Sequence, residues 1–394
     1  MLDSSPLLLA GAGHAHLFLL ARRRQLPMRE VILVEPGGFW YSGMASGVLG
    51  GRYAPAEDRL EPRRVMRNTA GDGGATLIRA RLVGLDHARR EALLDNGQRL
   101  KVSGLSLNLG SSTILPETIT SKDNGINADM PTLWPVKPIT ALIGLRRRLS
   151  AELAAGRRPR LVVVGAGASG IEIACNLRAL AEHCGGDARI QLVSRSAEPL
   201  PEAPTGARRW LRRHLEKRGI ELLAGREFKR LTPGAALLAA APSGASPQAA
   251  EQDIRLEQLD ADHVVMASGL SAPEVIFRLG LPVLEGRGLA VEDTLQSPAA
   301  DWVFAAGDCA AMINHRLPRL GVYGVRQAPV LLANLTAWHR GQPLSHYRPQ
   351  SRALTILNLG AGMGLALRGR AWFAGRLAFV VKQWLDQRFL DGYR

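Results

Sequence analysis

Cysteine is scarce in this chain, and the positions of the few cysteines argue against common disulfide and metal sites. The 394 residues contain three, Cys175, Cys184 and Cys309, with no CxxC or CxxxxC spacing. Such spacings hold redox-active disulfides and zinc, so we expect neither a redox disulfide nor a metal site. Unpaired thiols are typical of a reducing compartment, so we expect a cytoplasmic protein.

Long apolar runs and acidic residues are also few. No uninterrupted apolar stretch approaches the ~20 residues of a membrane-spanning helix, so any membrane contact should be made from the cytoplasmic face. The chain has 35 acidic against 50 basic residues, a net charge of +15. A basic surface attracts polyanions. However, no zinc knuckle, recognition helix or aromatic-basic platform accompanies the charge, so we expect no nucleic-acid partner.

Two glycine-rich loops are the most informative features that are present. Each follows an apolar run typical of a buried parallel strand and precedes a helical pattern. The first such unit runs from Leu7 to Gly13, and the second from Leu161 to Gly170. Glycines there let the backbone approach a pyrophosphate, and the helix N-terminus attracts its charge. Two loops predict two dinucleotides in one chain, most simply a flavin and the nicotinamide that reduces it.

The strand that follows each loop ends differently. Glu35 closes the first, 22 residues after Gly13, where a carboxylate can accept hydrogen bonds from an adenosine ribose. Ser194 and Arg195 close the second, and an arginine can pair with a 2′-phosphate. The pattern favours NADPH, whereas Gly170, the third glycine of that loop, favours NADH, and Arg195 could simply be solvated. The sequence leaves the donor open.

The order of the strand patterns predicts the domain organisation. We expect an α/β fold with two Rossmann-like domains. Strand patterns typical of the first domain return after those of the second, which indicates that the second domain is inserted into the first. The predicted first domain comprises 1–138 and 288–345, the second domain 139–287, and a C-terminal region 346–394. The segment 39–48 is small, aromatic and glycine-rich, which predicts a loop near the flavin ring.

Four short motifs extend this interpretation to a known group: Gly11 to His16, Tyr41 to Met44, Val136 to Ile139 and Gly324 to Pro329. The chain resembles the flavoproteins with two dinucleotide-binding domains, which include type II NADH dehydrogenases and sulfide:quinone reductases. More narrowly, it resembles the NADH-dehydrogenase-like module often fused to selenide, water dikinase. The resemblance implies a glutathione-reductase-like fold in which the NAD(P) domain is inserted into the FAD domain, with FAD as cofactor and NAD(P)H as electron donor.

The resemblance also implies roles for individual residues. Asp308 matches the aspartate that binds the ribityl chain of FAD, and His16 stands where a third glycine is expected. His16 either turns toward the cofactor or packs between helix and strand. The residues assigned to FAD are Gly11, Gly13, His14, His16, Glu35, Ser42, Gly43, Met44, Gly110, Gly307, Asp308 and Gln327. Those assigned to NAD(P)H are Gly165, Gly167, Gly170, Ser194, Arg195 and Gly269.

Two residues are candidates for catalysis on the same grounds. Lys137 would lie near the flavin, where a cation can stabilise negative charge on the reduced ring. Its alternative is a solvated linker lysine. Glu172 matches a glutamate that faces nicotinamide and flavin, or else is a polar residue in the first turn of its helix.

The electron acceptor is less clear. Type II dehydrogenases carry an Ala-Gln pair beside the quinone, and the matching stretch here is Gly321-Val322. We therefore expect a quinone or another small acceptor. The alternative function is a flavin-holding redox sensor or partner protein in selenium metabolism that turns over little.

The C-terminal segment from Arg370 to Arg394 spaces its apolar residues three and four apart, with cations between them. This pattern predicts one amphipathic helix, which either lies on a membrane surface or docks on the protein. The sequence also leaves the oligomeric state open, a homodimer included.

Overall fold

Two mainly parallel sheets form the framework of the computed structural model, which describes residues 5–68, 74–116, 129–241, 255–350 and 352–394. The first sheet has the order β22-β23-β9-β1-β2-β5. Its central strands are β1 (Leu7–Ala10), β2 (Val31–Val34) and β9 (Gly104–Leu107), and all three are fully buried runs. Its other strands are β5 (Ala75–Ile78), β22 (Gln296–Ser297) and β23 (Ala300–Ala305).

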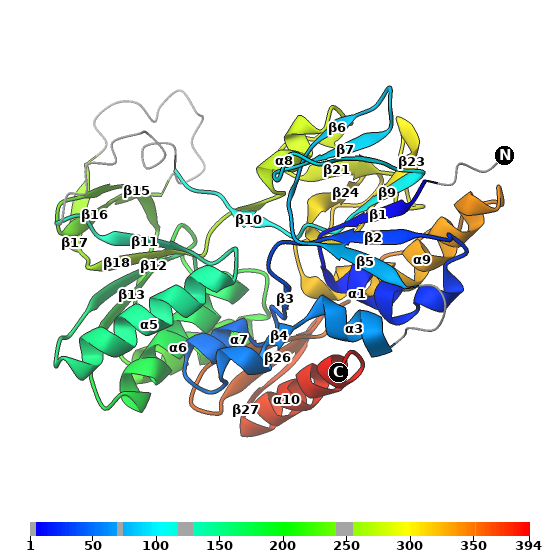
Figure 1. Cartoon of the computed structure of the whole chain (residues 1–394). Helices are drawn as coiled ribbons and strands as arrows, with labels where there is room; N and C mark the ends of the chain where they lie inside the picture. Colours follow the sequence, from blue (N-terminus) through cyan, green and yellow to red (C-terminus); the bar gives the residue numbers. More distant parts are fainter. Residues whose placement is uncertain (1–4, 69–73, 117–128, 242–254, 351) are drawn as a thin grey trace.

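The second sheet has the order β11-β18-β12-β13-β14, with every pair parallel. Its strands are β11 (Thr132–Pro135), β18 (His263–Met266), β12 (Arg160–Val164), β13 (Arg189–Ser194) and β14 (Ile220–Ala224). Helices α5 (Thr140–Ala154), α6 (Ala168–His183) and α7 (Thr205–Lys217) accompany this sheet (Figure 1). A sheet buried by helices favours continuous apolar strands, which explains the run Leu161 to Val164.

The chain passes between the two sheets along a short antiparallel ribbon. Strand β10 (Ser112–Thr113) pairs with β19 (Leu270–Ser271), so the outgoing and returning segments lie side by side. Because β11 already belongs to the second sheet, the second domain begins before residue 132 and ends near 270. The predicted boundaries at 138 and 287 are therefore too late in the chain, although the inserted order of the two domains is as expected.

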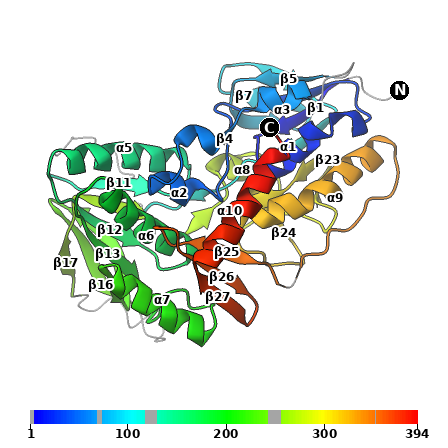
Figure 2. The same ribbon diagram turned by 90° about the horizontal axis from the view of Figure 1, so that it is seen from below.

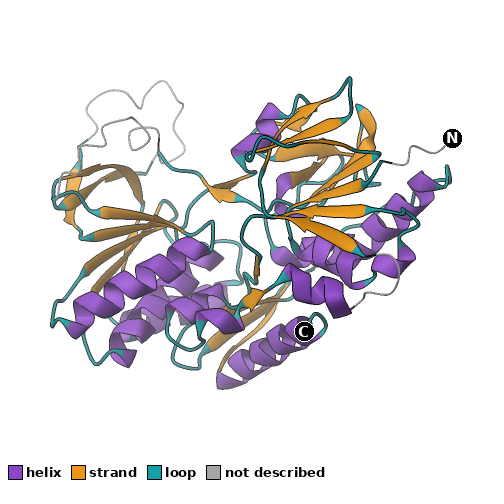
Figure 3. Cartoon of the chain, viewed as in Figure 1, coloured by secondary structure: helices purple, strands orange, loops and turns teal. Residues whose placement is uncertain are grey.

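Smaller elements complete the first domain (Figure 3). They include helices α1 (His14–Ala21), α3 (Pro62–Asn68), α8 (Glu274–Arg278) and α9 (Gly321–His339). They also include a meander of β6 (Leu82–Asp86), β7 (Glu91–Leu94) and β8 (Arg99–Lys101), and a sheet of β20 (Val283–Leu284), β21 (Gly288–Val291) and β24 (Ala310–Met312). In the second domain, β15 (Arg226–Thr232), β16 (Ala235–Ala240) and β17 (Glu257–Asp260) form a separate antiparallel sheet.

The segment predicted as a loop is partly regular. Residues 39–48 contribute β3 (Phe39–Trp40) and the start of α2 (Ala45–Leu49), and β3 pairs with β4 (Arg59–Leu60). Helix α2 packs on α5 and α6 of the second domain, so its small residues serve close helix contact. Composition alone suggested a loop, because it does not distinguish small residues in a loop from small residues at a close helix contact.

The C-terminal region is not a single helix. Strands β25 (Thr355–Asn358), β26 (Gly364–Arg368) and β27 (Ala371–Gly375) form an antiparallel sheet, and α10 (Arg376–Asp391) follows it. The prediction of one helix from 370 onward is therefore wrong for 371–375, where the apolar pair Trp372-Phe373 lies in a strand. Figure 2 shows α10 running from this sheet toward α1.

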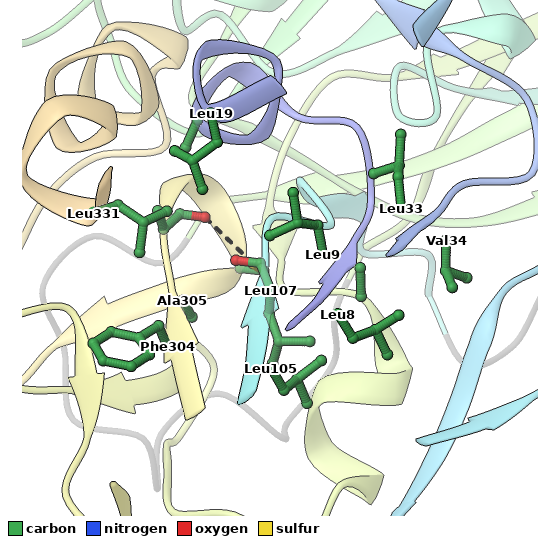
Figure 4. Packing of buried hydrophobic residues seen from close by; sticks show 14 of the residues in the cluster. Leu8, Leu9, Leu19, Leu33, Val34, Leu105, Leu107, Phe304, Ala305 and Leu331 are labelled. Carbon is green, nitrogen blue, oxygen red and sulfur yellow. Dashed lines mark hydrogen bonds between the residues drawn. The ribbon is translucent and has the colours of Figure 1, made fainter. Parts of the chain in front are cut away.

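Leucines dominate the core of the first domain. Leu8, Leu9, Leu105 and Leu107 are fully buried between the helices, and Phe304 of β23 closes the layer beside them (Figure 4). Burial of large apolar side chains is the main favourable term in folding. Because these strands are apolar on both faces, their carboxyl ends are held firmly at one edge, where the site lies.

Candidate functional site

One large cavity, of about 1280 Å³, lies where the two domains and the C-terminal region meet. A typical ligand pocket measures roughly 300–1,000 Å³, so this one has room for a dinucleotide and a second ligand. Among the predicted residues, the following line it: Gly11, Gly13, His14, Glu35, Ser42, Gly43, Gly110, Lys137, Glu172, Gly307 and Asp308. The structure thus brings most of the FAD set and both candidate catalytic residues to one cavity.

The first glycine loop forms one wall of the cavity. Gly11 has φ +85°, a conformation that residues with a Cβ rarely adopt, and a Cβ there would lie 2.7 Å from the Asn108 carbonyl oxygen. A Cβ at Gly13 would lie 2.3 Å from Asn108 Oδ1. The glycines are therefore required by contact with Asn108, in addition to any contact with a pyrophosphate.

Asn108 is the residue of this wall that the sequence did not reveal. Its Oδ1 accepts hydrogen bonds from the amides of Ala15 (2.9 Å) and His16 (3.4 Å), and its Nδ2 donates to the Ala306 carbonyl (2.6 Å). It thereby joins the first turn of α1 to the end of β23. The only signal in the sequence was its place at the end of an apolar strand before Gly110.

Glu35 is oriented by the same loop. Its Oε2 accepts a hydrogen bond from the Ala12 amide (2.9 Å), and its Oε1 accepts from the amides of Gly37 (2.8 Å) and Gly38 (3.1 Å). The carboxylate is therefore held beside the loop and along the cavity, where the strand-end rule puts the adenosine ribose.

Asp308 is held at the same carboxyl edge of the first sheet, after β23. It lies in a 3-10 turn (Gly307–Cys309), and its Oδ2 accepts a hydrogen bond from Ser111 Oγ (2.7 Å). Gln327 of α9 does not line this cavity. Its Oε1 accepts from the Gly307 amide (2.7 Å), so it fixes the turn that carries Asp308.

The two histidines of the first loop differ sharply. His14 lines the cavity among aromatic rings, 5.0 Å from Phe39 and 5.3 Å from Phe389 between centroids. Burial lowers its pKa to about 4, so it is neutral at pH 7. His16 does not line the cavity. It is fully buried, with Nδ1 2.6 Å from the Gly11 carbonyl oxygen and Nε2 2.8 Å from Ser106 Oγ, as the packing alternative expected.

The turn from Tyr41 to Met44 meets α10. Ser42 and Gly43 line the cavity, whereas Met44 is buried outside it. Lys382 Nζ donates to the Gly43 carbonyl (2.7 Å) and pairs with Asp386 Oδ2 (3.0 Å). The predicted cationic flank of the helix is therefore in part buried.

Tyr41 completes this junction, because its hydroxyl donates to Asp386 Oδ1 (2.9 Å). Burial raises the pKa of both the Tyr41 phenol and the Asp386 carboxyl. Lys382 and Asp386 were missed by sequence reasoning, although a charged pair four residues apart within an apolar stripe could have indicated a docked face.

Lys137 and Glu172 line the cavity on the side of the second domain. Lys137 follows β11, and its amide donates to Thr113 Oγ1 (2.9 Å) beside the ribbon that joins the domains. Glu172 lies one turn into α6, not in its first turn, and its Oε1 accepts from the Asn358 amide (2.6 Å). Burial raises the pKa of this carboxyl, so it binds a proton at a higher pH than an exposed glutamate does.

The residues assigned to NAD(P)H lie elsewhere, at the carboxyl edge of the second sheet. Gly165 follows β12, and a Cβ there would contact Ser268 and Ala267 beside Gly269. Gly165, Gly167, Gly170, Ser194, Arg195 and Gly269 do not line the large cavity, but Ala168, Ser169 and Ile173 of α6 do. The second loop therefore adjoins the cavity through the first turns of α6.

None of the three cysteines lines the cavity. Cys175 and Cys309 are fully buried, and burial raises the pKa of each thiol to about 12. At neutral pH both are thiols, which are poor nucleophiles.

Comparison with known proteins agrees with this architecture. A family model described as pyridine nucleotide-disulphide oxidoreductase matches residues 7–328. The chain belongs to this family. It is accordingly an FAD-dependent oxidoreductase with NAD(P)H as electron donor.

Individual relatives are distant. Demethylphylloquinone reductase NdbB of Synechocystis is 25% identical over 79% of this chain and 75% of its own length. The alternative NAD(P)H-ubiquinone oxidoreductase C1 of Arabidopsis thaliana is 25% identical over 76% of this chain and 60% of its own. The sulfide:quinone oxidoreductase of Aquifex aeolicus has the same fold, with a TM-score of 0.78 at 14% identity over 99% of this chain and 91% of that one.

The described residues fit FAD. The glycine loop offers a close backbone approach, Glu35 is placed for the ribose, and Asp308 lines the cavity further along. Arg319 also lines the cavity, and its guanidinium donates to the carbonyls of Asp308 and Leu270. We infer that these groups hold the cofactor, which supplies the hydride-accepting ring when bound.

Proposed function

We propose that this protein transfers electrons from NAD(P)H through FAD to a quinone. The observation that carries the proposal is the single cavity that reaches from the first glycine loop to α6 and to the C-terminal region. Its lining includes the apolar side chains of Val322, Leu354, Ile356, Leu385 and Phe389. Apolar side chains of this kind suit a hydrophobic ring substrate.

The names of the relatives support a quinone as the acceptor. The Synechocystis protein is a demethylphylloquinone reductase, and the Arabidopsis protein is an NAD(P)H-ubiquinone oxidoreductase. Gly321 and Val322 replace the Ala-Gln pair expected beside a quinone, and both line the cavity. The acceptor would therefore be held by shape and by residues of α10 rather than by that glutamine.

Two residues would support the chemistry. The Lys137 ammonium, at the cavity wall, would stabilise negative charge that develops on the reduced ring. Glu172 would hold a proton between the two domains, since its pKa is raised by burial and it also accepts from Ser46 Oγ (3.4 Å). A group of this kind can return the proton that quinone reduction consumes.

The test is anaerobic stopped-flow of the purified flavoprotein, with visible flavin absorbance as the signal. Rapid bleaching by NADH or NADPH, followed by rapid recovery with a quinone, is the expected result. Bleaching without recovery by any quinone would remove the acceptor from the proposal and favour the redox-sensor function. Absence of bound flavin would contradict the whole proposal.

We also propose that α10 holds the protein on the cytoplasmic face of a membrane. Its inner face, with Phe379 and Leu390, is buried, while Leu377 (68% exposed), Val380 (55%) and Trp384 (57%) form an outer row. Arg376 and Arg388 lie at the two ends of the row, as in helices that bind anionic lipid surfaces. No helix in the described part of the chain is long and apolar enough to cross a bilayer.

Sedimentation with phosphatidylglycerol vesicles would test the membrane contact. Trp384→Glu should reduce the bound fraction at least about tenfold, because it places a charge in the row. Phe277→Glu, at another exposed aromatic residue, is the matched control and should bind normally. The opposite result is a wild-type protein that fails to bind vesicles and forms a dimer that Trp384→Glu dissociates. That result would assign the row to a homodimer contact.

A further inference from the structure

The loop after β13 lies directly against the second glycine loop. The Gly165 amide donates to the Val193 carbonyl (2.8 Å), and the Leu200 amide donates to the Ala166 carbonyl (2.9 Å). The intervening residues, 194–199, are thus attached at both ends to the loop that would hold the pyrophosphate. In a dinucleotide-binding domain this position adjoins the adenosine ribose.

No carboxylate is available at the end of β13 itself. Ser194 is buried, and its hydroxyl donates to the Ser196 carbonyl (2.9 Å) and accepts from the Ser196 amide (3.1 Å). This hydroxyl is already used within the turn. The ribose ligand that Glu35 provides in the first domain therefore has no counterpart at the equivalent strand end.

The carboxylate within residues 194–199 is already paired. The next carboxylate along the chain, Glu198, pairs with Arg212 of α7 (3.2 Å), and Arg212 also donates to the Ala197 carbonyl (2.7 Å). Arg195 is exposed, and it forms no ion pair with any residue that the structure describes. Its guanidinium is consequently available to an anionic ligand beside the glycine loop.

The third glycine of the loop does not argue for NADH once its surroundings are known. A Cβ at Gly170 would lie 1.7 Å from the Gly165 carbonyl oxygen. Glycine is required at this position by the contact between the loop and the first turn of α6, whichever nucleotide binds.

We propose that Arg195 binds a 2′-phosphate and that NADPH is the preferred electron donor. This inference rests on the proposed function, in which a nicotinamide nucleotide binds the second domain. A guanidinium and a phosphate form charge-assisted, bidentate hydrogen bonds, so the side chain fits that group. The arrangement of Ser194, Arg195 and the Glu198–Arg212 pair carries the proposal.

Calorimetric binding of two fragments, adenosine 2′,5′-bisphosphate and 5′-AMP, isolates the 2′-phosphate from electron transfer. We expect the flavoprotein to bind the bisphosphate at least about tenfold more tightly at low ionic strength. Arg195→Ala should abolish most of this difference and leave AMP binding unchanged. Arg189→Ala removes the same charge at the opposite end of β13 and should change neither affinity.

The remaining outcomes separate this inference from the proposed function. Equal affinity of the wild type for both fragments, or an undiminished preference in Arg195→Ala, would overturn the inference and leave the flavin and quinone chemistry untouched. Weaker AMP binding in Glu198→Gln would assign the ribose to Glu198 and also overturn it. Binding of neither fragment would contradict the nucleotide site of the proposed function itself.

Discussion

The two dinucleotide-binding domains share a strand, a glycine loop and a helix, yet each closes its loop differently. In the first, Asn108 reaches from β9 to the amides of Ala15 and His16. In the second, Gly170 lets α6 approach the Gly165 carbonyl directly. His16 in the first domain occupies the position of Gly170, and its ring fills the space between Gly11 and Ser106.

The difference shows that one backbone design tolerates two ways of supporting the helix. Where the helix stands away from the loop, side chains fill the gap and satisfy the amides. Where the helix touches the loop, glycine is obligatory. The segments after the second strand differ too. The first domain sends β3 and the start of α2 to the cavity, whereas α7 of the second domain packs beside β14 and meets Trp372 of the C-terminal sheet.

The largest expected effects come from adding a methyl group to each loop. Gly170→Ala puts a Cβ against a backbone oxygen that cannot move aside, so we expect about 3 kcal/mol or more of destabilisation in the second domain and loss of AMP binding. Gly13→Ala displaces the Asn108 side chain and should release flavin instead. Gly74→Ala is the control, because it lies outside both loops and nothing lies within 4 Å of its Cβ. Flavin content and AMP titration measure the two losses. Normal AMP affinity in Gly170→Ala would show that the contact between α6 and the second loop does not require glycine.

Asn108→Ala should have the next largest effect. It leaves the Ala15 amide and the Ala306 carbonyl buried without their partner, at about 1–3 kcal/mol each. We expect a lower thermal midpoint together with weaker flavin retention. The second domain has no equivalent of this asparagine in its loop, so AMP binding should survive. Asn96→Ala, in an exposed turn, is the matched control, and equal midpoints for the two variants would show that Asn108 does not support the loop.

Sequence reasoning found the parts of this comparison that depend on backbone pattern. The apolar strands, both glycine loops and the inserted order of the domains follow from local periodicity and spacing. The hydrogen bonds that join Asn108 to Ala15 and Tyr41 to Asp386 could not be found in this way, since each connects residues far apart in the chain. The partition of α10 into a docked and an exposed face likewise depends on which strands lie beneath it.

The segment between β2 and β5 predicts a pH effect on stability. Asp58, at the start of β4, is buried, and burial raises the pKa of its carboxyl to about 8. Because the folded state keeps this proton while the unfolded state loses it above about pH 4, stability should fall as pH rises from 4 to 8. Asp58→Asn should remove a loss on the order of 4 kcal/mol, measured by urea unfolding at pH 5 and pH 8. An equal loss of unfolding free energy between pH 5 and pH 8 in the wild type and in Asp58→Asn would exclude Asp58 as the cause of the loss.

The smallest expected effect concerns the strand end of the first domain. Glu35→Gln keeps the shape of the side chain, but one oxygen that accepts from the loop amides becomes an NH₂ group that cannot. It also removes the charge that would meet the FAD ribose. We expect flavin to dissociate about tenfold more readily, which corresponds to about 1.4 kcal/mol, with little change in the thermal midpoint. Unchanged flavin retention would show that Glu35 only holds the loop and does not bind the ribose. The strand end of the first domain would then no longer support the assignment of Arg195 at the strand end of the second.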